Sequence, residues 1–195
     1  MRLVILVRHC AHDEIGKVLS GRSEIGLNAA GRAQAEALAC ALGSATIASL
    51  HCSPRRRARE TIAPLAERRG LALHVAAAFD EIDFGRFKGR DFANLQDDPD
   101  WHCWNARRGT ARCPGGETMA EASARAEAYI AALAPRDFPA LCVTHCDVIR
   151  GFVAHQLGLG FERLFAFDCD PASRTTLELS QGAVRLVALN ERVLP

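Results

Sequence analysis

The feature that most constrains this chain is a short apolar run that ends in charged side chains. Residues 4–10 read VILVRHC, so four apolar residues lead directly into Arg8, His9 and Cys10. Such a run is typical of a parallel strand that is buried on both faces. Because ligands bind at the carboxyl ends of such strands, Arg8 and His9 are expected at a ligand site. The arginine favours an anion. The alternative is that both residues end the strand in solvent.

A second run of the same kind lies later in the chain. Residues 141–146 read LCVTHC, so His145 follows an apolar strand as His9 does. Arg57 also lies just beyond a predicted strand, at residues 47–52. Because the carboxyl ends of parallel strands meet at one edge of a sheet, the two histidines could face one another across one pocket.

Three carboxylates follow the predicted strand at residues 71–76, and any one of them could be the acid of the site. They are Asp80, Glu81 and Asp83. Two histidines, two arginines and one carboxylate suit phosphoryl transfer without a metal ion or other cofactor. One neutral histidine would attack phosphorus, and the arginines would bind the phosphate oxygens. The carboxylic acid would protonate the leaving oxygen and then activate water.

Strands and helices alternate along most of the 195 residues. The predicted strands are 2–7, 47–52, 71–76, 141–144, 175–179 and 184–189, and the predicted helices are 29–42, 53–69, 118–133 and 147–157. Asn28 is expected to cap the first helix, and Ser180-Gln181-Gly182 to join the last two strands in a hairpin. The pattern predicts an α/β fold with a mainly parallel sheet, in a single domain over residues 1–195.

The segment at about residues 79–117 has a different composition, because glycines, acids and aromatic residues are mixed in it. We interpret it as a long functional loop with short helices that forms a cap-like region over the site. Trp101 and Trp104 lie within it. We interpret these two tryptophans as part of a small satellite core rather than as a platform for a ligand.

The formal net charge of +1 gives no reason to expect binding to nucleic acid or to a membrane. The arginines at 55, 56 and 59 could form a basic patch, but Glu60 and Glu67 favour a solvated helix face. We expect no signal peptide, since charged residues interrupt the first apolar run, and no apolar run is long enough to span a bilayer. Eight scattered cysteines without a C-x-x-C pair favour free thiols in a reducing cytoplasm.

At these residues the chain resembles the histidine phosphatase superfamily, the phosphoglycerate-mutase-like fold. The resemblance implies a three-layer α/β/α sandwich, with His9 as nucleophile and Arg8 and Arg57 as phosphate ligands. It also implies Glu81 as the proton donor and His145 as the second histidine, which contributes to catalysis and binds the substrate. Further matches to the family lie at Gly31, Gln34-Ala35, Thr61, Phe84-Gly85, Pro114-Gly115-Gly116-Glu117-Thr118 and Val148-Ile149-Arg150.

The chain departs from the family where Cys10 and Cys146 stand in place of glycine, directly after the two histidines. The residues after Cys10 also differ, so His12, Ser20, Arg22 and Cys146 are the candidates for substrate contacts. If the histidines converge, the two thiols could form a disulfide or bind zinc with them. The interpretation we favour is that both thiols simply fill space.

We therefore predict a cytoplasmic, metal-independent phosphatase that hydrolyses a small phosphate monoester through a phosphohistidine on His9, with Glu81 as proton donor. The resemblance allows phosphorylated sugars, nucleotide-like molecules or phosphoacids as substrates. A phosphoglycerate-type mutase is the alternative enzyme. From a different class, the alternative is a non-catalytic module that binds a phosphorylated ligand or is redox-regulated. The sequence leaves the oligomeric state open.

Overall fold

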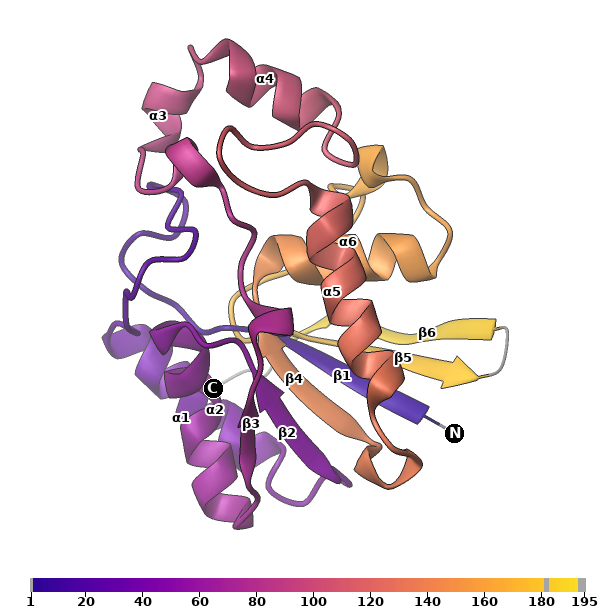
Figure 1. Ribbon diagram of the computed structural model, residues 1–195. Helices are drawn as coiled ribbons and strands as arrows, with labels where there is room; N and C mark the ends of the chain where they lie inside the picture. The colour runs from indigo at the N-terminus through magenta and orange to yellow at the C-terminus, as the bar shows by residue number, and fades with distance from the viewer. Residues whose placement is uncertain (1, 181–182, 193–195) are drawn as a thin grey trace.

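A six-stranded sheet forms the centre of the molecule (Figure 1). The computed structural model describes residues 2–180 and 183–192. Its strands are β1 (Arg2–Arg8), β2 (Ser49–Cys52), β3 (Leu73–Val75), β4 (Ala140–Thr144), β5 (Arg174–Ser180) and β6 (Ala183–Glu191), in the order β3-β2-β4-β1-β5-β6. The first four pair in parallel, and β5 and β6 are antiparallel. The mainly parallel sheet and the final hairpin are confirmed, although turn residues 181–182 lie outside the described residues.

Helices cover both faces of this sheet, which gives the expected three layers (Figure 1). Helices α1 (Ala29–Ala41) and α2 (Arg56–Arg69) pack on one face, where Leu38 and Ile62 meet Leu50 and Val143. Helices α5 (Met119–Ala132) and α6 (Cys146–Gln156) pack on the other face. Short 3-10 turns lie at Ala77–Phe79, Gly85–Phe87, Pro135–Asp137 and Phe161–Arg163. No helix in the described part of the chain is both long and apolar enough to cross a membrane.

Capping side chains fix where the helices begin. The side chain of Asn28 accepts a hydrogen bond from the Gly31 amide at the start of α1, as predicted. Thr118 and Glu121 form the expected capping box of α5. The predicted start of α2 at Ser53 is wrong, because the helix begins at Arg56. The Ser53 hydroxyl instead accepts a hydrogen bond from the Arg55 amide at 3.2 Å, which closes a turn before the helix.

The segment over residues 79–117 contains the short helices α3 (Phe92–Leu95) and α4 (Pro99–Ala106), drawn at the top of Figure 1. Trp101 and Trp104 stack with their ring centroids 5.4 Å apart. Phe84 and Phe87 pack edge-on against these two rings. The two tryptophans therefore belong to a satellite core beneath this segment, as the composition favoured.

The basic residues at the start of α2 are largely engaged by carboxylates. Arg56 pairs with Glu60 one turn along the helix at 2.6 Å. Arg55 contacts Glu24 at 2.6 Å and Asp80 at 3.0 Å. The local pairing agrees with an ion-paired helix surface rather than an uncompensated basic patch.

A close contact with α1 positions the loop that follows β1. The Ala11 carbonyl accepts the Asn28 amide at 3.1 Å, and the Ala11 amide donates to the Gln34 side chain at 2.9 Å. A methyl group at Gly31 would lie only 2.0 Å from the Ala11 oxygen. Position 31 must therefore lack a side chain if the loop beyond His9 is to lie against α1.

We predict that Gly31→Ala destabilises the protein. Alanine gains up to about 1 kcal/mol over glycine inside an unhindered helix, but overpacking typically costs about 1–3 kcal/mol. The very short contact with Ala11 makes the second effect larger, so urea denaturation is expected to show a net loss of at least about 1 kcal/mol. Ala33→Ser, at an exposed position of the same helix, is the control. Equal stability of Gly31→Ala and wild type would contradict the steric argument.

Candidate active site

The two histidines that follow apolar strands lie side by side at the carboxyl edge of the sheet. Strands β1 and β4 are neighbours, and Arg8 is in register with Thr144. The His9 amide donates to the Thr144 carbonyl at 2.9 Å, which extends the ladder by one residue. The ring centroids of His9 and His145 are 5.2 Å apart. The parallel pairing thus produces the juxtaposition expected from the sequence.

The hydrogen bonding of His9 fixes which ring nitrogen carries the proton. His9 is 4% exposed, and its Nδ1 lies 2.9 Å from the Cys10 carbonyl oxygen. A carbonyl oxygen can only accept, so Nδ1 must donate. Burial, followed by the charges of Arg57 and Arg8, lowers the pKa of His9 well below its usual value. The ring is therefore neutral, and its Nε2 lone pair is available for another partner.

His9 lies in the wall of a cavity, and the two predicted arginines line the same cavity. Arg57 is 1% exposed, and its guanidinium donates to the Gly21 carbonyl at 2.7 Å. Arg8 donates to the Cys169 carbonyl at 2.7 Å. The Nε groups of both arginines are buried without a hydrogen-bond partner among the described residues. Both arginines are held in place by these hydrogen bonds and keep N–H donors without a partner, so they are suited to bind an anion in the cavity.

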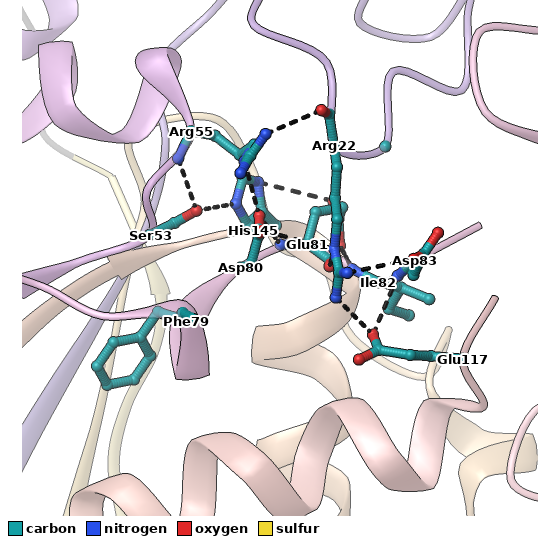
Figure 2. A network of polar contacts seen from close by, with 12 residues as sticks. Arg22, Ser53, Arg55, Phe79, Asp80, Glu81, Ile82, Asp83, Glu117 and His145 are labelled. Carbon is teal, nitrogen blue, oxygen red and sulfur yellow. Dashed lines mark hydrogen bonds and ion pairs between the residues drawn. The ribbon is translucent and has the colours of Figure 1, made fainter. Parts of the chain in front are cut away.

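His145 is fully buried, and both of its ring nitrogens have protein partners. Its Nδ1 lies 3.0 Å from a guanidinium nitrogen of Arg57, which can only donate, so Nδ1 accepts. Its Nε2 then carries the proton and lies 2.7 Å from the Ser53 hydroxyl (Figure 2). Burial and the charge of Arg57 lower the pKa of His145 well below its usual value. The cavity lining does not include His145, and its expected contact with the substrate stays a prediction.

Glu81 is the carboxylate that reaches both the cavity and His145. One of its oxygens accepts the Ile82 amide at 2.9 Å, and the other lies 3.7 Å from His145 Nδ1. Burial, with a further contribution from the Asp147 carboxylate, raises the pKa of Glu81 to about 8. Because His145 is neutral, this 3.7 Å contact is not a charged ion pair. Near neutral pH most of Glu81 holds a proton that it can donate.

The two competing carboxylates are engaged elsewhere. Asp80 contacts Arg55 at 3.0 Å and Arg22 at 3.5 Å, and Asp83 contacts Arg22 at 3.2 Å (Figure 2). Neither aspartate lines the cavity. Of the three acids that the sequence offered, the geometry favours Glu81 for a proton transfer in the cavity.

Arg22 lies in an ion network beside Glu81 and not in the cavity lining, and its expected contact with a substrate stays a prediction. Its guanidinium donates to the Glu81 carbonyl at 2.9 Å and contacts the Glu117 carboxylate at 3.0 Å (Figure 2). Glu117 also accepts the Asp83 amide at 3.0 Å. The carboxylates around Arg22 consume its donors, so the arginine positions the Glu81 backbone.

The cavity has a volume of about 500 Å³, and its lining includes the predicted His12, Ser20 and Cys146. The ring centroid of His12 lies 5.1 Å from that of His9. Burial, followed by the charges of Arg57 and Arg8, lowers the pKa of His12 to about 4, so this ring is also neutral. The lining also includes Trp101, for which a ligand contact was the less favoured alternative, and residues that were not predicted there, among them Arg108, Asp147, Arg150 and Phe165.

The two cysteines after the histidines lie in different surroundings. Cys10 is fully buried in a cluster with Leu27, Ala35 and Ala172. Cys146 lines the cavity, and its thiol lies 3.7 Å from the Cys169 carbonyl oxygen. Both thiols are free, and among the described residues no His, Cys, Asp and Glu side chains are grouped to hold a metal ion. The packing of Cys10 agrees with the favoured space-filling interpretation.

The chain is similar to known phosphatases. Residues 4–192 match the model of the histidine phosphatase superfamily (branch 1). An acid phosphatase of Mycobacterium tuberculosis is 29% identical over 196 residues, which cover 95% of this chain and 91% of the relative. An adenosylcobalamin/alpha-ribazole phosphatase of Escherichia coli is 25% identical over 198 residues, covering 100% and 98%. The chain belongs to the histidine phosphatase superfamily.

A solved relative has the same fold. The mycobacterial glucosyl-3-phosphoglycerate phosphatase in complex with VO3 superposes with a TM-score of 0.86 and 29% identity, covering 98% of this chain and 100% of the other. The family and these relatives together indicate a phosphatase.

We predict that His9 is a neutral ring protonated on Nδ1 at pH 6. Its contact with the Cys10 carbonyl requires this tautomer, and the lowered pKa keeps the ring uncharged. Two-dimensional NMR spectra that correlate the ring nitrogens with the carbon-bound ring protons distinguish this form from the imidazolium and from the other tautomer. Comparison with His9→Ala assigns the signal. A His9 ring that is mostly charged at pH 6 would contradict the electrostatic argument.

Proposed function

We propose that this protein is a metal-independent phosphatase that hydrolyses a small phosphate monoester through a phosphohistidine on His9. The observation that carries the proposal is the neutral His9 ring in a cavity wall that also holds two arginines and a protonated glutamate. A histidine with a free Nε2 lone pair beside fixed cations has the chemistry of a nucleophile for phosphorus.

In the first step the phosphate dianion binds to Arg8 and Arg57, whose charges balance its own. The Nε2 lone pair of His9 forms a bond to phosphorus while the bond from phosphorus to the leaving oxygen breaks. Glu81 transfers its proton to that oxygen, so the alcohol leaves uncharged. The raised pKa of Glu81 supports this role, because the acid form persists to about pH 8.

In the second step Glu81 is a carboxylate and acts as a base. It takes a proton from a water molecule whose oxygen attacks phosphorus, and the phosphorus–nitrogen bond breaks. Inorganic phosphate leaves, His9 is neutral again and Glu81 is protonated for the next cycle. The Arg22 contact with the Glu81 carbonyl supports the same carboxyl position in both steps.

The cavity volume supports a small metabolite as the substrate, since ligand pockets of this class hold molecules of modest size. The names of the relatives point to phosphorylated metabolites of several kinds, including alpha-ribazole phosphate and glucosyl-3-phosphoglycerate. All eight cysteines are free, which supports a reducing compartment such as the cytoplasm.

The direct test is hydrolysis of p-nitrophenyl phosphate in the presence of EDTA and a thiol reductant. Wild type is expected to turn over, and His9→Ala to lose at least about a thousand-fold in kcat/KM, since a nucleophile is removed. His155→Ala, at an exposed histidine outside the cavity lining, is the control and retains activity. Rapid quenching of wild type should trap an acid-labile phosphoryl group that is absent from His9→Ala.

Other outcomes of this experiment would favour the alternatives. Turnover that is equal in wild type and His9→Ala would contradict the proposed intermediate. Tight phosphate binding without turnover of any monoester would favour a binding module. Transfer of the trapped phosphoryl group to a second metabolite in preference to water would favour a mutase.

A second prediction concerns the decline of activity in alkaline solution. Since Glu81 donates a proton in the first step, kcat/KM should fall as pH rises through about 8. Asp147→Asn removes a negative charge that disfavours ionised Glu81, so its pKa falls and the decline should move to lower pH. Asp168→Asn, at an exposed carboxylate, is the control for net charge. A decline at the same pH in all three proteins would show that Asp147 does not tune Glu81.

A further inference from the structure

Two thiols that the reaction does not use, those of Cys146 and Cys169, lie together beside the cavity. Cys146 is the first residue of α6 and lines the cavity. Its Sγ lies 3.7 Å from the Cys169 carbonyl oxygen. Cys169 is 4% exposed and belongs to the core cluster against which Cys146 packs. The sulfur of Cys169 is also a hydrogen-bond partner of the Cys146 sulfur, so the two thiols are in contact.

The two thiols differ in a way that suits successive roles in an oxidation. The hydrogen bond from Cys169 and the positive charges of Arg8 and Arg150 lower the pKa of Cys146, although burial opposes them. The hydrogen bond with Cys146 and burial raise the pKa of Cys169 well above its usual value. A thiolate is the form that reacts with peroxides, and a neighbouring thiol can then react with the product. Cys146, which is reached through the cavity, is suited to the first role and Cys169 to the second.

This pair differs from the one that the sequence suggested. Cys10 follows His9 directly, but its side chain is fully buried in a small apolar cluster and does not line the cavity. Burial raises the pKa of the Cys10 thiol to about 11, so little thiolate forms there. The cysteine in place to react with Cys146 is therefore Cys169.

We propose that oxidation by a hydroperoxide joins Cys146 and Cys169 in a disulfide, which makes Cys146 a modification site in the cavity wall. The Cys146 thiolate attacks one peroxide oxygen, the oxygen–oxygen bond breaks, and the other oxygen takes up a proton and leaves as water or an alcohol. The sulfur of Cys169 then attacks the sulfur of the sulfenic acid on Cys146. The sulfur–oxygen bond breaks, and hydroxide leaves with the Cys169 proton as water. The thiols thus lose two electrons and two protons in all, and the peroxide is reduced.

The disulfide would act on phosphate binding through Arg8. The guanidinium of Arg8 donates to the Cys169 carbonyl at 2.7 Å, so the backbone of Cys169 holds it in place. Bonded sulfurs are only about 2 Å apart, much closer than two thiols in contact, so the residues that carry them must move together. A shift of Cys169 displaces the carbonyl that holds Arg8, and a shift of Cys146 moves the cavity wall near it. The oxidised protein is therefore expected to bind phosphate more weakly than the reduced protein.

The test identifies the disulfide by mass spectrometry and needs no turnover. The reduced protein is treated with a slight excess of hydrogen peroxide, the remaining thiols are alkylated, and the chain is digested with trypsin. The expected product is a linked pair of peptides, residues 137–150 and 164–174, in which fragmentation places the link between Cys146 and Cys169. Cys169→Ser should instead leave a sulfenic acid on Cys146 that reacts with dimedone. Cys40→Ser, which removes an exposed thiol from α1, is the control and should still form the disulfide.

Calorimetry with inorganic phosphate tests the effect on the site. The oxidised wild type is expected to bind phosphate at least about tenfold more weakly than the reduced wild type, because a charge-assisted contact with Arg8 is disturbed. Treatment with dithiothreitol should reduce the disulfide and restore the affinity.

Two kinds of result would overturn the inference. A wild type that forms no disulfide, or that links Cys146 to Cys10 or Cys142, would refute the assignment of Cys169. Equal phosphate affinity in the oxidised and reduced proteins would refute the effect on Arg8. Neither result bears on the hydrolysis of p-nitrophenyl phosphate by the reduced protein, so the phosphatase would stand. Conversely, the linked peptides would establish the modification site even in a protein that hydrolyses no monoester.

Discussion

The parallel pairing of β1 with β4 is the interaction on which the site depends. It places His9 and His145 with their rings 5.2 Å apart, and the last bond of the ladder is made by the His9 amide itself. A slip of one residue in this register would turn every side chain of β1 to the opposite face. The apolar side chains of β1 face helices on both sides of the sheet, so packing opposes such a slip. The geometry of the histidines is therefore specified by the core and not by the histidines.

Burial then sets the protonation states in the site. The buried guanidinium of Arg57 opposes positive charge on both histidines, and burial acts in the same direction, so both rings are neutral. For Glu81 the two effects compete: Arg57 favours the carboxylate, whereas burial and Asp147 favour the acid, and the acid wins up to about pH 8. The same surroundings thus keep the two histidines neutral and Glu81 protonated at the same pH.

The sequence predicted the parts of this site that follow strong hydrophobic patterns. The runs before His9 and His145 are short and apolar, and each is followed directly by polar residues. Their strands and the proximity of the two rings could therefore be predicted. The ion network of Arg22 could not be predicted, because its partners Asp83 and Glu117 lie far from it in sequence and no local pattern reports such a network. Arg108 and Arg150 were not assigned to the pocket for a related reason. Arg108 follows a segment without periodicity, and Arg150 reaches the cavity through the tertiary placement of α6.

The stacked tryptophans of the 79–117 segment allow the cavity to be monitored by fluorescence. The chain contains only two tryptophans, and both belong to this stack. Trp101 lines the cavity, and Trp104 lies against the guanidinium of Arg108. All tryptophan emission of the protein therefore originates at the wall where the outer part of a ligand would lie. The unmodified chain has an intrinsic fluorescent reporter of occupancy that is separate from His9.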